Sequence, residues 1–151
     1  MTDKVYTDYF FDEPAYNTHD GGYIPLVTPQ VAPQPLAIPP LLQPDKSTAT
    51  DDYYTVKAQA SETQFLPGKK TKTWGYNAGF LGQTIVFRDG KKTHIDLKNE
   101  LPELTTFHWH GLNVPGLLPD GGCNAPVYPG ATNHIDFNVL NTVSTIGLHA
   151  Q

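Results

Sequence analysis

The chain has 151 residues, and ten Lys and Arg against fifteen Asp and Glu give a formal net charge of −5. That length suits one domain with an arm, and the acidic balance argues against nucleic acid or an anionic membrane surface as a partner. No apolar run approaches the roughly 20 residues of a spanning helix, and the N-terminus has no secretory apolar stretch. With one cysteine, Cys123, no intrachain disulfide forms, and a cytoplasmic location is expected.

The first fifty residues are rich in proline, with Pro14, Pro25, Pro29, Pro33, Pro35, Pro39, Pro40 and Pro44. Proline lacks the N–H of a sheet ladder and holds φ near −65°, so an extended, polyproline-like segment is expected. A disordered tail is one interpretation. Apolar residues such as Leu36, Ile38 and Leu41 favour the other, an arm that packs across a folded surface. We therefore predict an extended Pro-rich arm over residues 1–50 and a folded domain over residues 51–151.

From residue 51 onward the hydrophobic pattern has period two, which is typical of half-buried strands. Tyr54, Val56, Ala58 and Ala60 form one such row. The pattern predicts strands at 53–60, 71–76, 84–87, 93–97, 104–110, 133–140 and 143–149. The Asp89–Gly90 pair favours a tight hairpin between 84–87 and 93–97. Short strands of this number predict an all-β protein, an antiparallel β-sandwich.

Two of the six histidines stand in the sequence His108-Trp109-His110-Gly111. Residues i and i+2 of a strand point to the same face, so both imidazoles project together while Trp109 faces the other way. Imidazole nitrogen is a common ligand for copper and zinc, and the pair could share one metal or serve two. The spacing alone is a weak signal for a metal site.

A third histidine, His149, lies on another predicted strand near Gln151. These two positions have the same i, i+2 spacing as His108 and His110, but glutamine stands at the second position. The amide oxygen of glutamine is a poor substitute for imidazole at a soft or borderline metal. Thus His108, His110 and His149 could supply three nitrogens without closing a cage around the metal.

Several longer motifs resemble the first, N-terminal cupredoxin domain of bacterial three-domain laccase-like multicopper oxidases. They are TWGYN at 73–77, GQTI at 82–85, NEL at 99–101, TTFHWHGL at 105–112, DGG at 120–122, PG at 129–130 and NHIDF at 133–137. The sequence at Ile38–Leu42 resembles the N-terminal extension of that subgroup. The resemblance covers nearly the whole chain and implies a cupredoxin-like Greek-key β-sandwich.

The resemblance also implies a cofactor and roles for the histidines. His108 would bind the type 2 copper, and His110 and His149 would bind type 3 coppers, which makes this chain half of a copper cluster. Gln151 stands where the family has a further histidine. Family members take the other half-cluster and the type 1 copper from a C-terminal cupredoxin domain, which would be the missing partner.

The resemblance also implies a function with a clear limit. The family oxidises phenol-type donors and reduces O2 to water, yet this chain by itself is expected to have negligible activity. The sequence ends before the strand that follows the second histidine pair in the family, so the sandwich is expected to be incomplete at its C-terminal edge. Two alternatives stay open: a copper-free, non-enzymatic scaffold, or a fragment that forms homo-oligomers by strand pairing between copies at the open edge.

The remaining candidates have structural interpretations. Trp74 and Trp109 are expected in the core or as a shield for the cluster. His94 and His134 are expected to face solvent, and His19 lies in the arm where it could bind stray metal. Cys123 is interpreted as a free loop thiol because no type 1 copper pattern accompanies it. Asp120 either lines a water path near the cluster or forms a turn with the following glycines.

Overall fold

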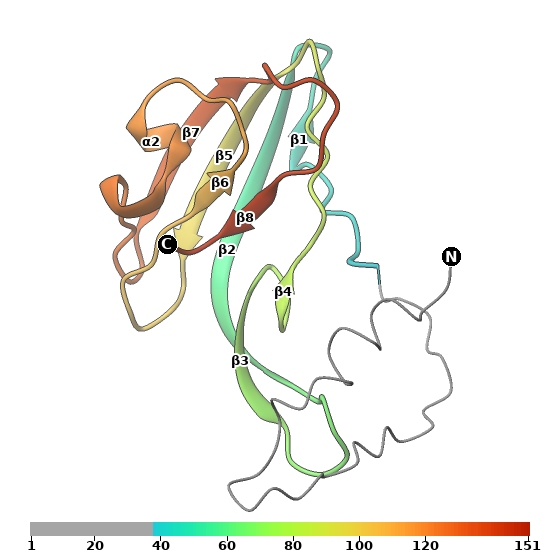
Figure 1. Cartoon of the computed structure of the whole chain (residues 1–151), viewed down its shortest axis with the longest axis vertical. Coiled ribbons are helices and arrows are strands. Elements are labelled where there is room, and N and C mark those ends of the chain that lie inside the picture. Colours follow the sequence, from blue (N-terminus) through green and yellow to red (C-terminus); the bar gives the residue numbers. More distant parts are fainter. Residues whose placement is uncertain (1–37) are drawn as a thin grey trace, which may run out of the picture. The chain divides into compact units, whose positions relative to one another are not determined.

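A sheet built on one long strand forms most of the fold (Figure 1). The structure is a computed structural model that describes residues 38–151; the predictions for residues 1–37, including His19, lie outside this range. The strands of the main sheet are β1 (Lys46–Ser47), β2 (Asp51–Thr63), β3 (Thr71–Tyr76), β4 (Leu81–Gly82), β5 (Lys92–Asn99) and β7 (Thr132–Asn138). Their order is β4-β3-β2-β5-β7, with β1 paired to β2.

A second, two-stranded sheet consists of β6 (His108–His110) and β8 (Gly147–His149), paired antiparallel. It lies across the main sheet and covers part of one face (Figure 1). A single-turn helix, α2 (Leu117–Asp120), and a 3-10 turn, η2 (Gly122–Asn124), lie between β6 and β7 in sequence. No helix within residues 38–151 has the length and apolar character needed to cross a membrane. The described part is therefore nearly all-β, with two facing sheets.

The core lies on the strand faces that the predicted alternation of apolar and polar residues assigns to the interior. Along β2, buried residues alternate with partly exposed ones from Asp52 to Ala58, and the inward rows of β5 and β7 show the same period. Ala60 lies in the same row but is exposed, since the second sheet does not extend over that end of β2. The buried apolar cluster consists of Tyr54, Val56, Ala58, Ile95, Leu97, Leu101, Phe107, Trp109, Leu112, Val127, Ile135 and Phe137.

The prediction of a purely antiparallel sandwich is wrong at the centre of the sheet, because β2 and β5 pair in parallel. The connection after β4 runs back to the start of β2, where Lys92 N–H donates to the carbonyl of Thr50. Arg88 and Lys91 in this connection both bind Asp52 near the start of β2. β5 therefore begins beside the beginning of β2 and runs in the same direction.

The predicted hairpin between 84–87 and 93–97 is also wrong. Gly90 has a positive φ of 78° and the turn forms, with Lys91 N–H donating to the carbonyl of Arg88 at 3.2 Å. However, Thr84 forms its bridge with Leu41 upstream, not with β5. The N–H of Leu42 donates to Thr84 and the N–H of Thr84 donates to Pro40, at 2.8 and 2.9 Å. The division between arm and domain at residue 50 stays a prediction.

The TWGYN motif has a structural role at the end of β3. A Cβ on Gly75 would lie 2.7 Å from the carbonyl oxygen of Ala78, so only glycine fits there. Asn77 then ties β3 to β2: its Oδ1 accepts the N–H of Lys57 at 2.6 Å, and its Nδ2 donates to the carbonyl of Thr55 at 2.7 Å. The expectation of a core position is wrong for Trp74, which is directly opposite Ala60 in the inward-facing row but is 49% exposed at that end of the sheet.

Candidate metal centre

The pairing of β6 with β8 brings the three candidate histidines together. His108 and His110 project from the same side of β6, as their i, i+2 spacing predicts. His149 on β8 is directly opposite His108 in the antiparallel register. The three residues are a group in which one ring nitrogen from each lies within 4.8 Å of the others. The proximity of His149 depends on this strand pairing, because 39 positions separate it from His110.

The three imidazole rings form a nearly equilateral triangle. Ring centres are 5.8 Å apart for His108 and His110, 5.2 Å for His108 and His149, and 5.6 Å for His110 and His149. The Nδ1 of His110 lies 3.4 Å from the Nε2 of His149. His110 and His149 are exposed and His108 is partly buried, so the site opens to solvent on one side.

Backbone carbonyls orient two of the rings. The Nδ1 of His108 lies 3.0 Å from the carbonyl oxygen of Asp120, and the Nδ1 of His149 lies 2.8 Å from that of Ala150. A carbonyl oxygen only accepts, so each Nδ1 carries the proton and each Nε2 keeps its lone pair. Ligating histidines are commonly fixed in this way by a hydrogen bond from the other ring nitrogen.

The position of the Asp120 carbonyl depends on Gly121. This residue has a φ of +80°, and a Cβ there would lie 1.8 Å from the carbonyl oxygen of Phe107. The loop after α2 can therefore approach β6 closely only with glycine at 121. The carboxylate of Asp120 is 3.8 Å from His108 Nδ1, and its side chain is 45% exposed. Both interpretations of Asp120, as a turn residue and as a residue beside the cluster, agree with this placement.

Gln151 is held by its backbone. Its N–H donates to Thr106 Oγ1 at 2.7 Å, and Thr106 Oγ1 donates to its carbonyl at 2.8 Å. A Cβ built on Gly122 would lie 3.4 Å from Gln151 Oε1 and 4.0 Å from His108 Nδ1. The Gln151 amide and the Nδ1 edge of His108 therefore both lie close to Gly122. Sequence reasoning missed this role of Thr106, because nothing in a buried threonine marks it as a backbone clamp.

Within residues 38–151, the other histidines, His94 and His134, and the cysteine do not join this group. His94 was expected to face solvent but is partly buried: its Nε2 lies 2.8 Å from Asp51 Oδ1, and its ring stacks on Tyr53 at 4.4 Å. His134 is exposed as expected and lies 2.6 Å from Asp96. Cys123 is a free, exposed thiol in η2, as its interpretation as a loop thiol predicted.

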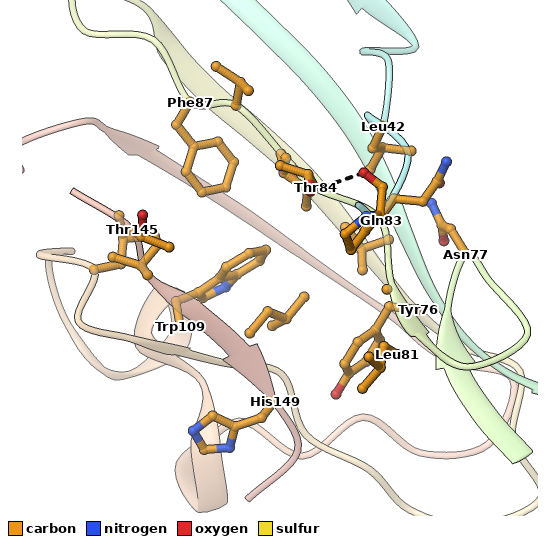
Figure 2. Close-up of a pocket in the computed structure, with 18 of the residues that line it drawn as sticks. Leu42, Tyr76, Asn77, Leu81, Gln83, Thr84, Phe87, Trp109, Thr145 and His149 are labelled. Atoms are coloured by element: carbon orange, nitrogen blue, oxygen red, sulfur yellow. Dashed lines mark hydrogen bonds between the residues drawn. The ribbon is translucent and has the colours of Figure 1, made fainter. Parts of the chain in front are cut away.

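The opposite face of β6 and β8 borders an apolar cleft of about 870 Å³ between the two sheets. Figure 2 shows the Trp109 indole among the lining side chains and the His149 imidazole on the other side of the strand. Trp109 is 2% exposed, and within residues 38–151 its Nε1 is the buried side-chain polar atom that lacks a hydrogen-bond partner. Tyr76 also lines the cleft, and burial raises its pKa to about 12, so its phenol is neutral at physiological pH.

The geometry fits a borderline-soft metal such as copper or zinc. Two nitrogens bonded to one tetrahedral ion at 2.0–2.1 Å are about 3.3 Å apart, close to the 3.4 Å between His110 Nδ1 and His149 Nε2. A ligand set of neutral imidazoles suits these metals better than Mg²⁺ or Ca²⁺, which prefer oxygen. A β-sandwich with paired strand histidines thus has a cupredoxin-like architecture and offers a donor set suited to copper or zinc.

Comparisons with known proteins agree with this class. A sequence profile described as multicopper oxidase matches residues 57–151. The crystal structure of a laccase from Pediococcus acidilactici Pa5930 has a TM-score of 0.77 and 52% identity, covering 92% of this chain and 30% of that one. The multicopper oxidase mco of Staphylococcus aureus is 40% identical over 114 residues, which is 76% of this chain and 25% of that protein.

A further relative is described as a cell division protein, FtsP, from Sodalis glossinidius; it is 33% identical over 118 residues, 78% of this chain and 24% of that protein.

The chain belongs to the multicopper oxidase family, and its fold is that of a bacterial laccase-like cupredoxin domain. This confirms the family and the cupredoxin-like fold that the sequence motifs indicated. The chain spans only about a quarter to a third of the length of the relatives above. The presence of the three histidines in one cluster is observed, whereas their metal binding stays a prediction.

Proposed function

We propose that the chain is the first domain of a laccase-like multicopper oxidase and supplies ligands for half of a copper cluster. The observation that carries this proposal is the convergence of three imidazoles from β6 and β8, with two Nε2 lone pairs left free by backbone hydrogen bonds. In this assignment His108 binds a type 2 copper, and His110 and His149 bind type 3 coppers. The bound coppers would supply the one-electron steps that link oxidation of phenol-type donors to reduction of O2 to water.

The protein's own contribution is to hold and orient the ligands. The carbonyl of Asp120 fixes the proton of His108 on Nδ1, so Nε2 is available without deprotonation. Trp109, buried on the opposite face, packs against Phe87 with ring centres 5.6 Å apart and keeps the strand between the two histidines in place. The exposed sides of His110 and His149 leave room for ligands from another domain.

That other domain is part of the proposal. The relatives are three to four times as long as the region they share with this chain. The remaining cluster ligands and the type 1 copper would come from a C-terminal cupredoxin domain, whose site would receive the donor's electrons. The chain by itself is therefore expected to consume no O2 above background with a phenol such as 2,6-dimethoxyphenol. Steady O2 consumption by the purified chain would contradict this.

A copper-free role is the second candidate. Gln151 stands at a position that the family resemblance gives to a ligand, and a relative described as a cell division protein shares the domain. The open apolar cleft and the short second sheet also favour association between copies through strand pairing. Sedimentation over a range of protein concentrations distinguishes the cases, because self-association raises the mean mass with concentration whereas a monomeric copper domain keeps it constant.

The deciding experiment measures copper per chain after anaerobic loading and desalting. The Cys123→Ser background removes the exposed thiol as a competing ligand. We expect copper to be retained by this protein and lost in the His108→Ala/His110→Ala variant. His134→Ala is the matched control, since it removes an exposed strand histidine outside the cluster. No retained copper in the parent protein would favour the scaffold instead.

A further inference from the structure

We propose that one end of the main sheet is a docking surface for an anionic lipid bilayer. This surface, called the tip below, consists of residues 64–72, where β2 ends and β3 begins, and residues 79–81, which lead into β4. Figure 1 shows the connection from β2 to β3 lying beyond the ends of β5 and β7. The proposal goes beyond the copper-binding role, because it uses neither the clustered histidines nor a bound metal.

Large apolar side chains of the tip are exposed to solvent. Leu66 is 75% exposed, and Phe65, Phe80 and Leu81 are exposed as well. The rings of Phe65 and Phe80 meet edge to face with their centres 4.9 Å apart, which joins the two segments into one surface. Contact with an apolar partner would remove this contiguous surface from water.

Positive charge borders the apolar surface. Lys69 and Lys70 follow Leu66 in the loop, Lys72 is the second residue of β3, and all three lysines are exposed. They are three of the ten basic residues of the chain. Glu62 is directly opposite Lys72 and offsets one of the three charges. The net charge of −5 argues against a basic face over the whole molecule, whereas this cluster is local and keeps a positive balance.

Exposed apolar side chains next to lysines match the chemistry of an anionic bilayer surface. Apolar residues enter the boundary between headgroups and acyl chains, and lysine stems lie along it with their ammonium groups at the headgroups. Trp74 shares a face of β3 with Lys72 and is half exposed, and the indole ring is favoured at membrane interfaces. A nucleic acid would account for the lysines but not for the exposed Leu66.

Hydrogen bonds hold the tip in shape without using its exposed apolar and basic side chains. Thr73 Oγ1 lies 2.9 Å from Thr63 Oγ1 and donates to the carbonyl of Gly79 at 2.6 Å, which fastens the segment before β4 to the sheet. Gln64 Nε2 donates to the carbonyl of Leu66 within the loop. A surface that is already formed loses less conformational entropy when it docks.

The test measures co-sedimentation of the full chain with vesicles of phosphatidylcholine, with and without about 30 mol% phosphatidylserine. We expect binding to the anionic vesicles that weakens as salt is added, and little binding to phosphatidylcholine alone. The tryptophan emission should shift to shorter wavelength on binding. Trp74→Phe, which retains the buried Trp109, should show no shift.

Charge variants test the basic part of the tip. Lys69→Glu/Lys70→Glu should weaken binding to the anionic vesicles at least about twentyfold, because each basic residue near an anionic leaflet strengthens binding about fivefold. Lys46→Glu/Lys98→Glu is the matched control, since it makes the same change in net charge at exposed positions outside the tip. We expect the control to keep most of the binding.

Apolar variants test insertion into the bilayer. Leu66→Asn should weaken binding about tenfold, because a leucine side chain no longer leaves water on docking. Val143→Asn removes an exposed aliphatic side chain outside the tip and should leave binding unchanged. Leu66, Lys69 and Lys70 are exposed, so their replacement is expected to preserve the fold.

Equal binding to neutral and anionic vesicles would overturn the proposal, and so would equal losses in the tip variants and their controls. Failure of the parent chain to bind anionic vesicles would also overturn it, including the case in which the chain binds single-stranded DNA or a second copy instead. Copper retention by the histidines is independent of each of these results, so this proposal and the proposed function fail separately.

Discussion

Asp52 is an acidic residue in the inward-facing row of β2, and only 2% of it is exposed. Ser47 donates to its carboxylate, and Lys91 and Arg88 form ion pairs with it at 2.9 and 3.1 Å. Breaking a fully buried pair costs about 3–5 kcal/mol. Arg88 and Lys91 are themselves 49% and 20% exposed, so solvent can compensate their charges; Asp52→Asn should therefore lower the free energy of unfolding by a smaller amount, roughly 2 kcal/mol. Urea unfolding measures this. Asp96→Asn, which removes an exposed carboxylate from a pair with His134, should cost under about 0.5 kcal/mol.

The same residue predicts a pH dependence. The hydrogen bond from Ser47, followed by that from Lys91, lowers the pKa of Asp52 from 3.8 to about 2. A depressed pKa in the folded state means that the unfolded state binds the proton first, so this stabilisation is complete above pH 4 and is lost as the pH falls toward 2. Parent and Asp52→Asn unfolding energies should therefore converge between pH 4 and 2. A constant gap across that range would contradict the assignment.

At the scale of elements, the turn from α2 to η2 decides how His108 is oriented. Gly121 and Gly130 have nearly the same φ, +80° and +77°, but a Cβ on Gly121 would lie 1.8 Å from a backbone oxygen while Gly130 has open space. Gly130→Ala should cost about 1–2 kcal/mol for the left-handed backbone alone. Gly121→Ala should cost at least about 3 kcal/mol because the loop must also move. Thermal or urea unfolding of the two variants tests this; equal losses would be inconsistent with the close approach.

The elements differ in how far the sequence predicts them. The strand at Thr71–Tyr76 is confirmed at both ends, because alternation and the motif that follows it are local properties. The parallel pairing of β2 with β5 is set by the return path through Arg88 and Lys91 to Asp52, contacts between residues 36 and 39 positions apart that no local pattern contains. The hairpin failed for the same reason, since Leu41 takes the ladder position at Thr84.

The candidate metal site, like the strands, can be predicted from the sequence only in part. Strand periodicity predicts that His108 and His110 share a face, and the family resemblance adds His149. The carbonyl of Asp120 could not be predicted, because every residue has a carbonyl and only the loop geometry at Gly121 aims this one at His108. Side-chain identity thus predicts which candidate ligands are present, whereas the tertiary structure determines their orientation.

At the scale of the whole molecule, Gln151 tests whether the chain can serve in an oxidase. A chimera in which this chain replaces the matching region of the Staphylococcus aureus multicopper oxidase would supply the other domains. An amide oxygen is a weak ligand for copper compared with imidazole, so the chimera should bind less copper and oxidise phenols slowly. Gln151→His in the chimera should raise the rate of O2 consumption at least about tenfold, since it restores a nitrogen ligand. His134→Ala, outside the cluster, should leave both versions unchanged. Equal rates with Gln151 and with histidine would mean that position 151 is not a copper ligand, and the copper-binding role would then rest on His108, His110 and His149 alone.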